Sequence, residues 1–164
     1  MDIMIIEKTI CFFCSKNKTA ICCDACKLAS CKHCSYFIDK DNFEFMSMLP
    51  KKLINKTFCP DCYSKGINKE IDEFHDILRR AKAVNVYSKK QGTETRFFRR
   101  IEKPVKVENY DDRNEALLHL TFLAAQKGFD TVVDLDLKSK KVNLDGNYKK
   151  LVWSGTAVPI KVNA

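Results

Sequence analysis

The 164-residue sequence lacks any apolar run near the roughly 20 residues that a helix needs to cross a bilayer. Its first residues do not resemble a secretory signal, and no cysteine follows residue 62. These absences argue against a membrane-spanning protein, against an exported protein held together by disulfides, and against a cysteine metal site in the second half of the chain. We therefore expect a soluble, cytoplasmic protein.

Cysteine is abundant in the first part of the chain. Eight of the nine cysteines form four C-x2-C pairs within residues 11–62. Two such pairs supply the four thiolates of a tetrahedral structural zinc site, so four pairs predict two sites. The pairs are Cys11/Cys14, Cys23/Cys26, Cys31/Cys34 and Cys59/Cys62.

The spacing between the pairs indicates how they share the metal. Only four residues separate the second pair from the third, so these neighbouring pairs would have difficulty facing the same ion. In a cross-braced finger, the first and third pairs bind one ion and the second and fourth pairs bind the other. We therefore predict two structural Zn²⁺ ions, each with four cysteine ligands. The first has Cys11, Cys14, Cys31 and Cys34, and the second has Cys23, Cys26, Cys59 and Cys62.

The central segment Cys-Asp-Ala-Cys-Lys-Leu-Ala-Ser-Cys-Lys-His-Cys-Ser, residues 23–35, resembles that of a FYVE-type finger, and residues 58–63 resemble its closing knuckle. The resemblance covers residues 11 to about 65 and implies a treble-clef domain over residues 1–65. The basic residues with which that family reads phosphatidylinositol 3-phosphate are absent from residues 19–24, so we do not expect recognition of this lipid. A RING finger resembles the segment less closely, because it rarely has four residues between the second and third pairs. A PHD finger shares this gap but usually has a histidine at the position of Cys31 and an aromatic residue at the position of Thr57.

Two residues near the ligands leave their roles open. Cys22 could replace Cys23 as a ligand, act as a redox-sensitive neighbour, or be a small buried side chain. His33 lies between two ligands, where a side chain usually points away from the metal, and we expect it on the surface.

Most apolar residues between the third and fourth pairs should form core, and some could form a partner-binding surface. They are Phe37, Phe43, Phe45, Met46, Met48 and Leu49.

A helix is predicted to link the finger to the second half, within residues 66–84. From Asn68 to about Val84, apolar residues recur at intervals of three and four, which places them on one helix face. The stripe is too short for an autonomous coiled coil and should dock on the finger or on the second domain. The stripe comprises Ile67, Ile71, Phe74, Leu78 and Ala81.

Residues 85–164 are predicted to form a small α+β domain with one helix on a mainly antiparallel sheet. Asp112 and Glu115 resemble a capping box at the start of the helix, and Gly128 is placed to end it. Val133, Leu135 and Leu137 should share one strand face, with Asp134 and Asp136 on the wet face. Asp145 and Gly146 are expected to form a hairpin turn. Strands are predicted at residues 84–88, 95–101, 131–137, 142–144, 148–153 and 156–162.

Parts of this half resemble the small bacterial YbjQ-like family. The matching segments are residues 125–133 (Ala-Gln-Lys-Gly-Phe-Asp-Thr-Val-Val) and 154–158 (Ser-Gly-Thr-Ala-Val), within a resemblance over about residues 84–162. The resemblance implies assembly into rings, and hence a homo-oligomer formed through the C-terminal domain. Because this half has no cysteine and only His119, we do not expect it to bind a metal.

The formal net charge of +8 is unevenly distributed, with +3 on residues 1–65, +4 on 66–104 and +1 on 105–164. Eight thiolates and two Zn²⁺ would make the finger slightly negative. A dense basic run in the middle part could contact phosphate backbones or other anions. The alternative is the solvated face of a strand whose aromatic residues, Phe97 and Phe98, turn inward. The run comprises Lys89, Lys90, Arg96, Arg99, Arg100 and Lys103.

These features favour a zinc-binding interaction or adaptor protein over an enzyme, because thiolates committed to structural zinc have little freedom to attack a substrate. The expected partner is a protein. The alternatives are a nucleic-acid-binding protein that uses residues 89–106, a RING-like ubiquitin ligase, and a phosphoinositide- or membrane-binding module.

Overall fold

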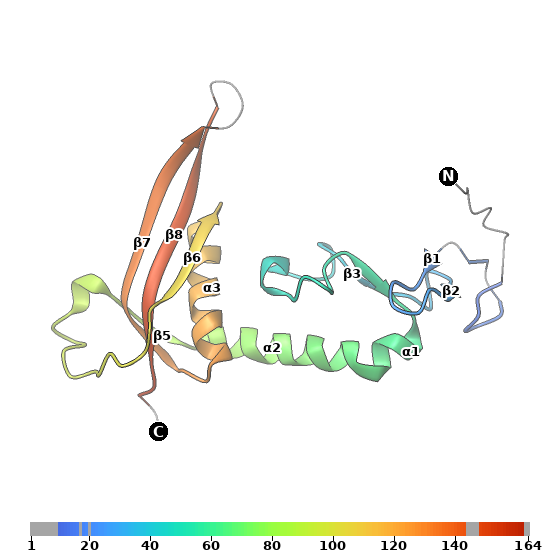
Figure 1. Ribbon diagram of the computed structural model, residues 1–164, viewed down its shortest axis with the longest axis horizontal. Helices are drawn as coiled ribbons and strands as arrows, with labels where there is room; N and C mark the ends of the chain where they lie inside the picture. The colour runs from blue at the N-terminus through green and yellow to red at the C-terminus, as the bar shows by residue number, and fades with distance from the viewer. Residues whose placement is uncertain (1–9, 17, 20, 144–147, 163–164) are drawn as a thin grey trace. The chain divides into compact units, whose positions relative to one another are not determined.

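The computed structural model describes residues 10–16, 18–19, 21–143 and 148–162. The chain divides into two compact units, residues 1–74 and 75–164, which we describe separately (Figure 1). The structure is mixed α/β, with few helices and small sheets.

Unit one contains two short antiparallel strand pairs, the β1–β2 hairpin and the pair β3–β4. Its core includes Ile38, Leu53 and Phe58, each less than 5% exposed. Met48 and Leu49 are also buried, whereas the four other apolar residues of the 37–49 stretch are half-buried. The elements that begin in this unit are β1 (Ile21–Cys22), β2 (Ala29–Ser30), β3 (Tyr36–Ile38), η1 (Met46–Met48), β4 (Lys56–Phe58), α1 (Pro60–Cys62), η2 (Tyr63–Ile67) and α2 (Asn68–Lys82).

Helix α2 confirms the helix predicted from the apolar stripe, and it crosses the boundary between the units at residues 74 and 75. Ile71 and Phe74 are buried in unit one, and Leu78 and Ala81 are buried in unit two. Ile77 is also buried, although the sequence-based stripe omitted it. Among the described residues, no helix combines the length and the apolar character needed to cross a bilayer.

Unit two is built on a four-stranded sheet with the order β5-β7-β8-β6, which α3 covers (Figure 1). Strands β5 and β7 are parallel, and the other two pairings are antiparallel. The predicted mainly antiparallel sheet with one helix is therefore confirmed. The elements are β5 (Asn85–Ser88), η3 (Lys89–Gln91), β6 (Val105–Tyr110), α3 (Arg113–Gln126), β7 (Thr131–Asn143) and β8 (Lys149–Ile160).

Both ends of α3 lie where the sequence predicts them. The Asp112 side chain accepts hydrogen bonds from the backbone N–H groups of Asn114 (2.7 Å) and Glu115 (2.9 Å), which satisfies two donors that have no partner inside the helix. At the other end, Gly128 adopts φ 83°, the left-handed conformation that suits glycine. The N–H of Phe129 then reaches the carbonyl of Ala124 at 3.0 Å.

The strand predicted at residues 95–101 is wrong. Residues 95–97 lie in turns, with hydrogen bonds from Thr95 N to the Gln91 carbonyl (3.3 Å) and from Phe98 N to the Thr95 carbonyl (3.0 Å), and residues 98–101 have no regular secondary structure. The strand of this region is β6, which the prediction missed. Its signal is the alternation of Val105 and Val107, both buried against α3, with exposed residues between and after them.

A β-bulge overturns the predicted face of β7. Val133 pairs with Val158, but the next pair is Asp136 with Thr156, so β7 holds one extra residue there. Asp134 occupies the bulge with φ 54°, a conformation that aspartate tolerates better than most residues. The bulge changes the alternation, so that Val132, rather than Val133, joins Leu135 and Leu137 in the core beneath α3.

Strands β7 and β8 are each continuous, where the sequence predicted two pieces for each. The predicted turn at Asp145 and Gly146 lies outside the described residues. The ladder between β7 and β8 runs from Thr131 with Ile160 to Asn143 with Lys149. It extends beyond the last pairs that β5 and β6 make with these strands (Figure 1).

Candidate metal centres

Eight cysteines of unit one form two groups of four. Within each group, the Sγ atoms all lie within 4.8 Å of one another. The groups have the membership expected from the spacing of the pairs. Centre one contains Cys11, Cys14, Cys31 and Cys34, and centre two contains Cys23, Cys26, Cys59 and Cys62.

The sulfur separations fit a shared metal ion. A tetrahedral zinc with Zn–S bonds of about 2.3 Å places its sulfurs about 3.8 Å apart. The Sγ atoms of Cys14 and Cys31 are 3.8 Å apart, and those of Cys26 and Cys59 are 3.6 Å apart. These distances exceed the roughly 2.05 Å of a disulfide bond, and all nine cysteines are free thiols. The donor set therefore fits a four-coordinate metal ion at each centre.

The first pair of each centre lies in a turn of the same geometry. Ser15, which follows Cys14, donates its N–H to the Cys11 carbonyl at 2.9 Å. In the same way, Lys27, which follows Cys26, donates its N–H to the Cys23 carbonyl at 2.9 Å. Both residues have a positive φ, 51° for Ser15 and 63° for Lys27. Glycine usually fills such positions, so these left-handed turns could not be recognised from the residue types alone.

The last pair is positioned by the start of a helix. Cys59 is the N-cap of α1, and its Sγ accepts a hydrogen bond from the N–H of Cys62 at 3.4 Å. Pro60 follows at the first helical position, where the absence of an N–H costs nothing. The closing knuckle thus leads directly into a helix.

The β1–β2 hairpin joins the two centres. Cys23 directly follows β1, and Cys31 directly follows β2. The hairpin therefore fixes one ligand of each centre relative to a ligand of the other. Cys31 also donates its N–H to the Sγ of Cys11 at 3.3 Å, which couples two ligands within centre one.

The thiols of each centre differ in acidity. Burial raises the pKa of Cys11. Hydrogen bonds from backbone N–H groups, including those of Cys14 and Cys31, outweigh this effect and lower the pKa to about 6. The neighbouring Cys31 thiol and burial raise the pKa of Cys34 to about 12. Close thiolates repel one another, so the full set of four negative charges requires a cation between them.

Asp24 supports centre two from outside the ligand set. It exchanges backbone and side-chain hydrogen bonds with Thr57, both 2.8 Å long, and its carboxylate lies 3.5 Å from Lys56 Nζ. The Thr57 N–H and the Lys56 charge lower the pKa of Asp24, against the opposing effect of burial. These contacts tie the second cysteine pair to β4, which leads to the fourth. Sequence reasoning did not assign this role.

We expect Asp24→Ala to weaken metal binding at centre two by roughly tenfold, the lower end of the effects seen when a supporting contact is lost. The reason is that the second pair would lose its side-chain hydrogen bond and its ion pair to β4, and would keep only the backbone hydrogen bond to Thr57, while all eight thiols remain. Competition with a chromophoric chelator measures the change. Asp41→Ala removes an exposed carboxylate of the same unit and should leave the affinity unchanged. Equal affinities for both variants would contradict a supporting role.

Cys22 and His33 lie outside both groups and are exposed. Cys23, by contrast, is fully buried within centre two. The structure therefore assigns the ligand position to Cys23 and excludes a buried position for Cys22.

The basic run of unit two does not form the face of a strand. Lys89, Lys90, Arg99 and Lys103 are exposed. Arg96 is exposed and lies over the ring of Phe97, 4.6 Å from its centroid. Phe97 is itself 79% exposed, so the expectation that it turns inward is wrong.

Arg100 differs from the rest of the basic run because it forms an ion pair with Asp134, the residue in the bulge of β7. The Arg100 guanidinium lowers the pKa of Asp134, and Asp134 raises the pKa of Arg100. Asp136 is paired with Lys138 at 2.9 Å. Both aspartates of β7 therefore have cationic partners, rather than forming a simple solvated face.

Comparison with protein-family models, with curated proteins and with solved structures finds no match to this chain. Four thiolates around one ion leave no open coordination position, which is the arrangement of a structural metal centre rather than a catalytic one.

Proposed function

We propose that the chain is a zinc-dependent protein-binding module without enzymatic activity. Two structural Zn²⁺ ions hold a FYVE-like, cross-braced finger, and the finger presents a recognition surface to a protein partner. Zinc fits because both ligand sets consist of four thiolates at tetrahedral separations. Metal analysis with native mass spectrometry tests this assignment, with two zinc ions expected per chain. A different metal, or fewer than two ions, would overturn it.

The observation that carries the proposal is an aromatic hollow of about 370 Å³ in unit one. Its walls include Ser35, which directly follows the ligand Cys34, and Tyr63, which directly follows the ligand Cys62. One wall residue therefore adjoins each centre, so metal binding at both centres positions the hollow. Phe37 and Phe43 also line it and are half-buried.

Tyr36 is the most accessible aromatic residue of the hollow. It is 46% exposed and stacks on Tyr63, with ring centroids 3.9 Å apart and planes 6° apart. Stacking fixes both rings before a partner arrives, which reduces the entropy lost on binding. Large, rigid aromatic side chains of this kind supply much of the energy in protein interfaces.

We expect the double variant Tyr36→Ala, Phe43→Ala to lose the partner while still binding two zinc ions. The two rings supply contact surface, whereas the eight ligands are unchanged. Affinity purification of the full chain, with zinc counted in the same samples, measures both properties. Phe12→Ala is the matched control, because Phe12 is a 65% exposed aromatic residue of the same unit outside the hollow. A partner retained by the double variant would contradict the proposal.

A further inference from the structure

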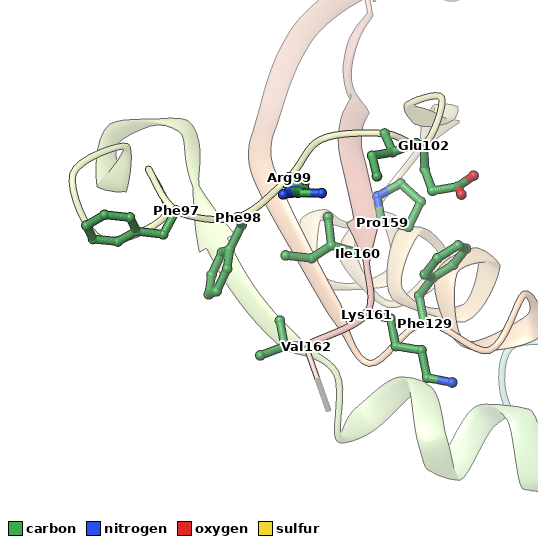
Figure 2. Close-up of a pocket in the computed structure, with 10 residues that line it drawn as sticks. Phe97, Phe98, Arg99, Glu102, Phe129, Pro159, Ile160, Lys161 and Val162 are labelled. Carbon is green, nitrogen blue, oxygen red and sulfur yellow. The ribbon is translucent and has the colours of Figure 1, made fainter. Parts of the chain in front are cut away.

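A second concave surface lies in unit two, and none of its lining residues belongs to the zinc centres. It is a groove of about 530 Å³ between the segment 97–102, Phe129 and the end of β8 (Figure 2). Apolar side chains form most of its lining, including Phe98, Ile101, Phe129 and Ile160. This volume falls within the range of roughly 300–1,000 Å³ that is typical of ligand-binding clefts.

The wall formed by residues 97–102 is held in place by Arg100. Its guanidinium donates to the Thr95 carbonyl at 3.1 Å and to the Phe98 carbonyl at 3.0 Å, while it forms its ion pair with Asp134. The bulge of β7 thus anchors a segment that has no strand pairing of its own among the described residues. On the opposite wall, Val162 donates its N–H to Asp130 at 2.9 Å. Hydrogen bonds within unit two therefore hold both walls of the groove.

The groove also leaves large apolar side chains accessible to solvent. Ile101 is 79% exposed and Val162 is 45% exposed, whereas Ile160 on the groove floor is only 5% exposed. Exposed apolar residues that border a concave apolar surface are typical of binding sites. The groove therefore has exposed apolar side chains at its rim and a buried apolar side chain on its floor.

The charges at the rim are mainly positive. Arg99 and Lys161 line the groove, and Glu102 is the single acidic residue in the lining. Arg96 and Lys103 flank the wall segment and are exposed. Charge complementarity therefore favours an acidic ligand. A second copy of the chain would instead bring the same cations against one another.

We propose that this groove binds an extended acidic peptide segment of a partner protein, with large apolar side chains on the floor and carboxylates on Arg99 and Lys161. A bilayer surface would reach the protruding Ile101 but not the concave floor. A nucleic acid would place phosphates against a floor of apolar side chains. Pro159, in the groove lining, has no N–H to give to an added strand, so recognition relies on side chains. This inference goes beyond the proposed function, because it concerns a different unit of the chain.

Selection of random twelve-residue peptides on the full, zinc-loaded chain tests the proposal. The library is first depleted on the double variant Ile101→Asp, Val162→Asp, whose substituted positions are exposed and whose fold should therefore be intact. We expect the enriched peptides to combine Asp or Glu with Phe, Leu, Ile or Trp. A synthetic peptide of an enriched sequence then serves as the probe in fluorescence anisotropy.

We expect Arg99→Glu combined with Lys161→Glu to weaken binding of that peptide by roughly tenfold or more, because both changes reverse a rim charge. Lys140→Glu and Leu151→Asp are matched controls, since both residues are exposed on the β7–β8 ribbon. The controls should stay within about twofold of the original chain. Peptide binding should also survive Tyr36→Ala with Phe43→Ala, so failure of the groove and failure of the finger surface can be distinguished.

Several outcomes would overturn the proposal. These are a failure to enrich peptides, enrichment without acidic residues, and rim variants that bind as tightly as the controls. Binding to vesicles that contain phosphatidylserine and binding to single-stranded DNA are measured with the same variants. Their oligomeric state is measured as well. Binding to vesicles or DNA, or self-association, that is lost only in the groove variants would assign the surface to that ligand instead.

Discussion

Replacing Cys59 with serine is expected to remove the metal from centre two and to unfold the finger. A serine hydroxyl is a poor substitute for a thiolate, and Cys59 is fully buried and also caps α1. A structural zinc supplies an apparent binding free energy of about 10–16 kcal/mol. A typical domain is stable by only about 5–15 kcal/mol. A small unit with few buried side chains therefore has no reserve to replace a lost ion.

The effect should reach the other centre, because the ligands interleave along the chain. The Cys23/Cys26 pair lies within the segment that centre one closes between Cys14 and Cys31. The β1–β2 hairpin joins a ligand of each centre. We expect the Cys59→Ser chain to hold at most one zinc ion, and to release it at a lower chelator concentration than the original chain does.

Native mass spectrometry with stepwise addition of a chelator measures both effects. Cys22→Ser is the matched control, because Cys22 is the exposed cysteine outside both groups. This control should keep two ions and the original chelator resistance. If Cys59→Ser also kept two ions, centre two as described would be wrong. If its single ion were held as tightly as before, the centres would be independent.

Gly155→Val is expected to destabilise unit two by about 1–3 kcal/mol, the usual cost of forcing extra atoms into a packed core. A Cβ atom at position 155 would lie 2.5 Å from Leu137 Cδ2 and 3.0 Å from Leu120 Cδ1. Leu120 is fully buried, so it has little room to move. Gly155 thus allows α3 to approach the sheet closely, which is a packing reason for the glycine in the Ser-Gly-Thr-Ala-Val segment.

Thermal unfolding followed by the fluorescence of Trp153, the single tryptophan, measures this change in unit two. Each kcal/mol should lower the midpoint by roughly 4–8 °C in a domain of this size. Gly92→Ala is the control, because a Cβ there would meet nothing closer than the Lys89 carbonyl at 3.8 Å. Equal midpoints for Gly155→Val and Gly92→Ala would show that α3 does not pack against Gly155 as described.

The sequence predicted the grouping of the eight cysteines well because cysteine spacing reflects geometry directly. A short gap between two pairs limits which thiols can meet, and the structure groups Cys23 with Cys59 and Cys11 with Cys31 accordingly. The caps of α3 could also be predicted, because Asp112 and Gly128 lie next to the ends of the helix and act on residues close to them in sequence. Local chemistry of this kind needs no knowledge of the tertiary fold.

The errors arise where tertiary contacts override local pattern. Residues 95–101 have the composition of a strand, but Arg100 holds them in a non-strand conformation through its pairing with Asp134, a residue 34 positions away. The bulge that presents Asp134 also reverses the face of β7, and a period-two pattern cannot reveal an inserted residue. Asp24 was missed for the same reason, because its partner Thr57 is distant in sequence.

The long β7–β8 ribbon has a consequence for the behaviour of the protein at high concentration. Beyond the last pairs with β5 and β6, both outer edges of this ribbon carry backbone groups that could pair with a strand of another molecule. Lysines are concentrated on this part of the ribbon, at positions 138, 140, 141, 149 and 150, and those at 140, 141 and 149 form no ion pair among the described residues. Repulsion between the lysines of two such edges opposes strand pairing between molecules, so these charges reduce the tendency to aggregate.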